Sequence, residues 1–178
     1  DWNNSSFNII ILNMQDFPSS ADEFLIGQIF PVNKPLGWSS FSVVKKIKYL
    51  IQKKYNLKKI KVGHAGTLDP LATGLLIICT GKFTKRISQI QSQEKTYSGI
   101  IKLGATTPSY DLETTINKNY ETSHITSKLI HETTKKFIGE IDQKPPVFSA
   151  LKKNGERLYK KARRGEKIKI ESRKVFVR

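Results

Sequence analysis

The chain has 178 residues, 38% of them hydrophobic and 26% charged, a composition that fits a globular domain and excludes a disordered or fibrous protein. Its 31 Lys and Arg against 15 Asp and Glu give a formal net charge of +16, which attracts polyanions such as nucleic acid, although a genome rich in lysine codons would give the same bias. One cysteine excludes a disulfide framework. Because no run of ~20 apolar residues and no signal-peptide pattern occurs, we expect a cytoplasmic protein without a membrane span.

The two ends of the chain indicate a piece of a longer protein. The sequence begins at Asp1, and its one methionine is Met14, so we expect residues 1–13 to be an upstream extension. Residues 174–178 have the pattern of a β-strand that has only begun. We therefore expect one domain over residues 14–178 that is incomplete at its C-terminus.

In chain order, the first predicted elements are an extended segment over residues 24–32, a turn over residues 33–38 and a helix. Either Ser39 or Ser40 can cap this helix. Its apolar residues return every three or four positions, at Val43, Val44, Ile47, Leu50 and Ile51. The opposite face and the residues that follow are either a solvated surface or a phosphate-binding one, because they carry Lys45, Lys46, Lys48, Lys53, Lys54, Lys58, Lys59 and Lys61.

The remaining predicted elements are a loop, two apolar segments and a second helix. Residues 63–74 form a loop rich in glycine, and Cys79 in the apolar run after it is expected to be buried. Residues 96–103 are typical of a β-strand. Thr126 is positioned to cap a helix that carries apolar residues and stops at Gly139.

Residues 63–74 hold the strongest chemical signal of the sequence. Their three glycines allow tight turns and the close approach of a ligand to the backbone. Pro70 restricts the preceding Asp69, so its carboxylate is held stiffly, as a nucleophile or a general base must be. An Asp-Pro pair in a glycine-rich loop is also a common structural turn, and physical reasoning leaves both interpretations open.

Several other kinds of site are excluded by spacing. A phosphate-binding P-loop needs Ser or Thr after its Gly-Lys pair, and this chain has Phe83 there. His64, His124 and His131 are scattered, so no set of residues has the spacing of metal ligands. We expect no metal and no cofactor.

Five segments in the same order resemble the motifs of TruB-type pseudouridine synthases. The densest is residues 63–76 (GHAGTLDPLATGLL), whose wording is closer to the bacterial branch than to the guide-RNA-dependent one. The resemblance covers residues 27–178. The other segments are residues 33–40 (NKPLGWSS), residues 95–97 (KTY), Leu103-Gly104 followed by Asp111, and residues 145–152 (PPVFSALK) followed by Gly155, Tyr159, Ala162 and Arg163.

The resemblance implies a mixed α+β fold, with a largely antiparallel sheet flanked by helices and an RNA-binding thumb loop. It implies a monomeric isomerase that converts uridine 55 in the T-arm of tRNA to pseudouridine. Asp69 would be its catalytic carboxylate, which could attack the sugar carbon, attack the base, or deprotonate the sugar. The reaction is redox-neutral, which agrees with the expected lack of cofactors.

The resemblance also assigns contacts to the RNA. The target base must be flipped out of the folded arm, which costs a few kcal/mol. By resemblance Tyr97 stacks on the flipped base and His64 contacts its nucleotide, while Lys34 and Pro35 support the loop. The basic tract over residues 152–178, with twelve Lys and Arg against three Glu, would bind phosphates together with the lysine-rich helix. The residues expected to do so are Lys45, Lys46, Lys152, Lys153, Arg157 and Arg163.

The chain departs from the family in what it lacks. Members carry a later strand with a second tyrosine and an arginine that pairs with the catalytic aspartate, and usually a C-terminal RNA-binding module. We expect both to lie beyond Arg178. The alternative hypothesis is therefore a non-catalytic module that binds or folds tRNA, for which Asp69 would be dispensable.

Overall fold

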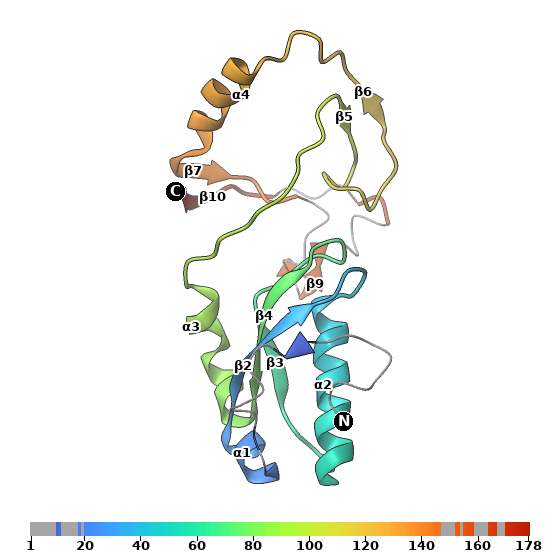
Figure 1. The fold of residues 1–178 in the computed structure, drawn as a ribbon, viewed down its shortest axis with the longest axis vertical. Helices are drawn as coiled ribbons and strands as arrows, with labels where there is room; N and C mark the ends of the chain where they lie inside the picture. Colours follow the sequence, from blue (N-terminus) through green and yellow to red (C-terminus); the bar gives the residue numbers. More distant parts are fainter. Residues whose placement is uncertain are drawn as a thin grey trace. The chain divides into compact units, whose positions relative to one another are not determined.

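The computed structural model describes residues 10–11, 18, 20–146, 152–153, 155–158, 164–166 and 170–178. Helices and antiparallel sheets are mixed along the chain, which confirms the expected α+β class (Figure 1). The chain divides into two compact units, Asp1–Tyr97 and Ser98–Arg178. No helix in the described part of the chain is long and apolar enough to cross a membrane.

Unit 1 is built on a four-stranded antiparallel sheet. Its strands lie in the order β1 (Ile10–Ile11), β2 (Ile29–Lys34), β4 (Gly74–Thr80) and β3 (Val62–Ala65). Lys34, the last residue of β2, lies opposite Gly74, the first residue of β4. The end of β2 and the loop that joins β3 to β4 are therefore at the same edge of the sheet.

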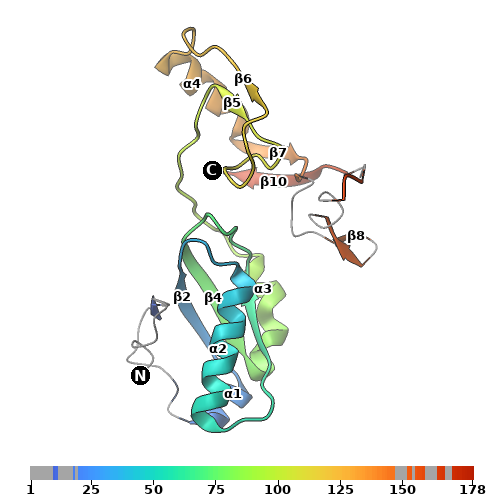
Figure 2. The same ribbon diagram turned by 90° about the vertical axis from the view of Figure 1, so that its right-hand side faces the viewer.

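Helix α2 (Ser40–Tyr55) covers one face of this sheet, as the sequence predicts (Figure 2). Ser39 caps it, because the side-chain oxygen of Ser39 accepts a hydrogen bond from the backbone N–H of Ser42 at 3.0 Å. Of the five apolar residues expected on its inner face, Leu50 is only partly buried. The other four pack into the core with Phe24, Phe30, Val32, Ile60, Leu76 and Ile78; they are Val43, Val44, Ile47 and Ile51.

The 3₁₀-helix η2 (Gly81–Arg86) and helix α3 (Ile87–Gln91) follow β4, and α3 lies on the side of the sheet opposite α2 (Figure 1). Gly63 in β3 permits close packing of α3, because a Cβ at Gly63 would lie 2.7 Å from the Cδ1 atom of Ile87. Cys79 is buried, as expected. Burial raises the pKa of its thiol, and the positive charge of Arg86 offsets only part of this rise.

The expected extended segment over residues 24–32 is wrong in its first part, where the chain forms helix α1 (Ala21–Ile26). Ser20 caps this helix by accepting from the N–H of Glu23, and its hydroxyl donates to the Glu23 carboxylate at 2.9 Å. Gly27, with φ of +137°, ends the helix. Local capping chemistry therefore outweighs the strand preference of these apolar residues.

The strand expected over residues 96–103 is also absent. This segment is assigned no regular structure, and the side chain of Ile100 is 99% exposed. A strand requires a neighbour to satisfy its backbone N–H and C=O groups, and no strand in the described residues pairs with it. The pattern of residues indicates a preference for pairing, but it does not supply the partner.

Unit 2 contains short antiparallel pairs and one helix. Strand β5 (Ala105–Thr106) pairs with β6 (Lys118–Asn119), β7 (Gly139–Gln143) with β10 (Arg173–Val177), and β8 (Lys152–Lys153) with β9 (Glu156–Arg157). Helix α4 (Ser127–Thr134) begins at the Thr126 cap, as predicted. It ends earlier than the predicted stop at Gly139, because the 3₁₀-helix η3 (Lys135–Phe137) follows it and Gly139 begins β7. The strand predicted at residues 174–178 is confirmed as β10.

Candidate active site

The loop that carries Asp69 is shorter than the sequence suggests. Residues 63–65 belong to β3 and Gly74 begins β4, so the loop proper covers residues 66–73. Gly66 and Gly74 at its two ends have φ of +115° and +116°, a region that L side chains rarely adopt. The Ala72 N–H donates to the Asp69 carbonyl oxygen at 3.0 Å, which closes a turn directly after the aspartate. The loop therefore has a defined conformation with the Asp69 side chain exposed.

Ser40 holds the residue before Asp69. Its side-chain oxygen accepts a hydrogen bond from the Leu68 N–H at 2.9 Å, and its hydroxyl donates to the Leu68 carbonyl oxygen at 3.1 Å. Ser40 itself is buried, with 2% of its surface exposed, so water does not compete for these bonds. One hydroxyl thus satisfies both backbone groups of Leu68, across 28 residues of sequence.

Two groups hold the residue after Asp69. The Gly37 N–H donates to the Pro70 carbonyl oxygen at 2.8 Å, and the Lys34 ammonium donates to the same oxygen at 3.4 Å. Lys34 is fully buried, and it also donates to the carbonyl oxygens of Pro35 at 3.0 Å and Trp38 at 2.6 Å. Lys34 therefore ties the turn after β2 to the Asp69 loop, in agreement with the supporting role expected for it.

The charge of Lys34 is linked to that of Asp69. Burial lowers the pKa of the Lys34 ammonium from its ordinary value of 10.5, and the negative charge of Asp69 opposes this shift. Hydrogen bonds to three backbone carbonyl groups hold the ammonium in its buried position. The aspartate loop is thus held by a cation as well as by neutral hydrogen bonds.

The two residues expected to contact the nucleotide are placed differently. His64 lies in β3, and its Nδ1 atom makes a short hydrogen bond with the carbonyl oxygen of Gly66, at the start of the loop. Tyr97 is 70% exposed. The chain just before Tyr97 does approach the loop, because the Cε atom of Lys95 lies 4.0 Å from where a Cβ at Gly66 would be.

The expected phosphate-binding residues are distributed over both units. Lys45 is exposed on α2, and Lys46 beside it is partly buried. In unit 2, Lys152 of β8 is the register partner of Arg157 in β9, and Lys153 is the partner of Glu156. Arg163 and residues 147–151 of the expected thumb loop lie outside the described residues.

Ser40 is the site residue that sequence reasoning did not identify. From the sequence, Ser40 is only one of two candidates for the helix cap. Ser39 forms the cap, and Ser40 binds Leu68. The available signal was the pair of adjacent serines, because a helix needs only one of them as its cap.

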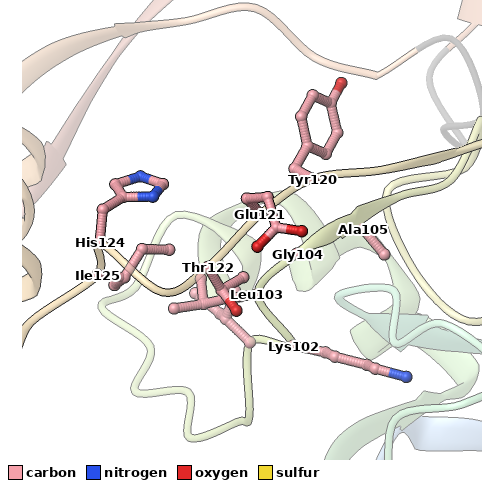
Figure 3. A pocket seen from close by; sticks show the side chains of 10 residues that line it. Lys102, Leu103, Gly104, Ala105, Tyr120, Glu121, Thr122, His124 and Ile125 are labelled. Atoms are coloured by element: carbon pink, nitrogen blue, oxygen red, sulfur yellow. The ribbon is translucent and has the colours of Figure 1, made fainter.

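A separate cavity of about 590 Å³ lies in unit 2 (Figure 3). It lies between two stretches of chain, residues 101–105 and residues 120–125, which are joined by a hydrogen bond from the Tyr120 N–H to the Gly104 carbonyl oxygen at 2.9 Å. None of the site residues expected from the sequence lines it. In the described residues, no group of three or more His, Cys, Asp or Glu could hold a metal ion.

Sequence comparison gives the class of protein to which this fold and loop belong. Residues 52–178 match the model of a family described as "TruB family pseudouridylate synthase (N terminal domain)". The class is therefore that of the pseudouridylate synthases. Within that class, the chain belongs to the TruB family, which confirms the resemblance seen in its motifs.

The curated relatives agree with this assignment. A protein of Flavobacterium johnsoniae named tRNA pseudouridine synthase B is 63% identical over 159 residues, which are 89% of this chain and 69% of the relative. Proteins of the same name from Parabacteroides distasonis and Phocaeicola vulgatus are 52% and 53% identical, over 87% and 86% of this chain and 66% of each relative. The chain thus spans about two thirds of the length of these relatives.

Proposed function

We propose that this chain forms most of the catalytic domain of an enzyme that isomerises uridine 55 in the T-arm of tRNA to pseudouridine. Support comes from the membership of the TruB family and from relatives named tRNA pseudouridine synthase B. The observation that carries the proposal is the fixed backbone on both sides of Asp69. Ser40 binds Leu68, and Gly37 and Lys34 bind Pro70.

The proposed reaction exchanges one bond to the sugar for another. The bond from N1 of uracil to the C1′ atom of ribose breaks, the base turns, and C5 bonds to C1′. The proton of C5 is lost and N1 takes up a proton, so atoms and electrons balance without an oxidant or reductant. Asp69 is the catalytic residue in this scheme, acting on the sugar carbon, on the base, or as the base that deprotonates the sugar.

A rigid loop suits this chemistry because the carboxylate must meet a base that has left its stack. Flipping costs a few kcal/mol, and binding energy from other contacts has to offset it. In the proposal Tyr97 stacks on the flipped uracil and His64 contacts the same nucleotide. The exposure of Tyr97 leaves its ring open to such stacking, worth ~1–3 kcal/mol per base.

The deciding experiment replaces the carboxylate by its neutral isostere. We expect Asp69→Asn in the complete protein to abolish pseudouridine formation in a T-arm transcript while the dissociation constant for the transcript stays near that of the wild type. Asp22→Asn is the matched control, because Asp22 is an exposed aspartate in unit 1 that lies in α1. It should leave both quantities unchanged.

The same measurement separates the proposed enzyme from a non-catalytic RNA-binding module. Undiminished pseudouridine formation by the Asp69→Asn protein would show that another group performs the chemistry. If the wild-type protein binds the transcript but never converts it, the module that binds or folds tRNA becomes the better description.

A further inference from the structure

The outer face of α2 carries aromatic and basic residues in alternation. Phe41, Lys45, Tyr49 and Lys53 follow one another at intervals of four residues, and we call these four the α2 stripe. Residues four apart on a helix are neighbours on its surface. The stripe therefore runs along α2, on the side away from the core residues Val43, Val44, Ile47 and Ile51.

Both rings of the stripe are exposed, at 59% for Phe41 and 55% for Tyr49. The Lys45 ammonium lies 5.0 Å from the centre of the Phe41 ring, and the Lys53 ammonium lies 6.0 Å from the centre of the Tyr49 ring. Each aromatic ring is thus paired with the cation one turn further along the helix. A surface that only faces water does not need large exposed rings next to ammonium groups, so this arrangement favours a binding surface.

The charge around the α2 stripe has a single sign. Residues 24–68 contain nine lysines and neither Asp nor Glu, so no acidic side chain along this stretch of sequence offsets the lysines. Helix α2 itself carries five of these lysines. A surface of this kind is complementary to a polyanion.

We propose that the α2 stripe binds the RNA that flanks the target nucleotide, with its rings against bases or ribose and its lysines against phosphates. Aromatic rings combined with cations are the elements that bind single-stranded nucleic acid without reading its sequence. An acidic protein would satisfy the lysines, but it would leave the two rings without a matching partner. The proposal rests on the proposed function because it takes RNA as the substrate.

The position of α2 gives the stripe a direct relation to Asp69. Helix α2 begins at Ser40, which binds Leu68, so Phe41 is one residue away from the support of the Asp69 loop. From Phe41 to Lys53 the stripe extends ~18 Å, at ~1.5 Å per helical residue. This length matches about five nucleotides at ~3.4 Å per step. In the proposal, RNA with a base at Asp69 continues along the helix.

The test compares three double variants of the complete protein by their affinity for a T-arm stem-loop transcript. One is Phe41→Ala with Tyr49→Ala, and one is Lys45→Gln with Lys53→Gln. The control is Lys82→Gln with Lys85→Gln, which removes the same charge from η2, where both lysines are exposed. Dissociation constants are measured at several salt concentrations, with thermal unfolding of each protein as a check on folding.

We expect the aromatic variant to bind at least about tenfold more weakly, because two stacking contacts are lost. The lysine variant should lower the slope of log K against log [salt] by about 1.4 to 1.8, at ~0.7 to ~0.9 for each phosphate contact removed. The control should bind like the wild type. Single-turnover rates at saturating RNA should be unchanged in the Lys82→Gln, Lys85→Gln control.

Three outcomes would overturn the α2 stripe as an RNA surface. The aromatic variant could bind as tightly as the wild type, the control could weaken binding as much as the lysine variant, or the stripe variants could lose thermal stability while RNA affinity stays constant. The last result would mean that the stripe residues pack against another part of this protein and do not contact RNA. A wild-type protein that binds the transcript but fails to convert it would contradict the proposed function alone.

Discussion

The position of Asp69 depends on its neighbours in sequence and on residues about thirty positions earlier. No hydrogen bond from the described residues holds the carboxylate itself, whereas the backbones of Leu68 and Pro70 are both bound. Backbone bonds of this kind leave the side chain open to a substrate and still restrict where it can point. In the proposed reaction Ser40 is accordingly a positioning residue, because it binds the backbone of Leu68.

Replacing Ser40 should reduce the rate of the reaction more than the binding of RNA. We expect Ser40→Ala to lower kcat about 10- to 100-fold, because a displacement of the catalytic group by ~1 Å can cost about 100-fold. KM should change little, since no RNA-binding group is removed. Steady-state kinetics on a T-arm transcript measures the two quantities separately.

Ser39→Ala is the matched control for this prediction. It removes the cap of α2 and should lower the free energy of unfolding by ~1 kcal/mol with kcat preserved. If both serine variants lose kcat equally, the effect of Ser40 is one of general stability and the positioning role is wrong.

At the scale of elements, α1 and η2 approach each other so closely at Gly81 that no other glycine in unit 1 has less room for a Cβ atom. A Cβ at Gly81 would lie 2.2 Å from the Leu25 carbonyl oxygen and 2.6 Å from the Phe24 carbonyl oxygen. Both atoms belong to the backbone, so a side-chain rotation cannot relieve the clash. Gly81 also has φ of +52°, which adds strain for any residue with a Cβ.

We therefore expect Gly81→Ala to lower the free energy of unfolding by about 2–5 kcal/mol, which combines overpacking with backbone strain. Gly37→Ala is the control, because Gly37 also has positive φ, at +78°, but nothing within 4 Å of a Cβ. It should cost only about 1–2 kcal/mol. Urea denaturation measures the free energy of unfolding of both variants, provided that the m-value is unchanged. Equal losses in the two variants would mean that the backbone of α1 can move away from a Cβ at position 81 at little cost.

The elements that the sequence predicts well are those whose signals are local. Helix α2 has a serine cap and a repeat of buried residues, both visible in the local sequence, whereas its end at Asn56 in the left-handed region was not predicted. Helix α1 also has a local signal, the Ser20 and Glu23 pair, but its apolar residues predict an extended segment instead. The segment over residues 96–103 failed for a different reason, because pairing depends on a partner elsewhere in the chain.

In the candidate site, too, the residues with a local sequence signal could be predicted and the contacts between distant segments could not. The motif singled out Asp69 and His64 as candidates; Asp69 lies in the loop over residues 66–73, and His64 lies in β3 and hydrogen-bonds to Gly66 at the start of that loop. The bonds from Ser40 and Lys34 to this loop join segments 28 and 36 residues apart, and no periodicity or spacing in the sequence reveals them. Such contacts become visible only when the sheet register places the end of β2 beside the start of β4.

For the whole molecule, the net charge of +16 predicts that binding of the T-arm transcript depends steeply on salt. If six or more phosphates are neutralised, affinity should fall about 10³-fold or more between 50 and 200 mM salt. A titration of labelled transcript at several salt concentrations gives the slope directly. A slope shallower than about −2 would mean that no more than about three phosphates are contacted, and most of the net charge would then play no part in RNA binding.

The hydrogen bonds that join the turn after β2 to the Asp69 loop have a consequence for genetics. If Asp69 is catalytic as proposed, a screen for loss of enzyme function should return substitutions at Lys34, Gly37 and Ser40 together with those at Asp69, because the first three residues bind the backbone on either side of it. Second-site suppressors of these changes should then arise within residues 66–73, where a different loop sequence can restore the carboxylate to its place.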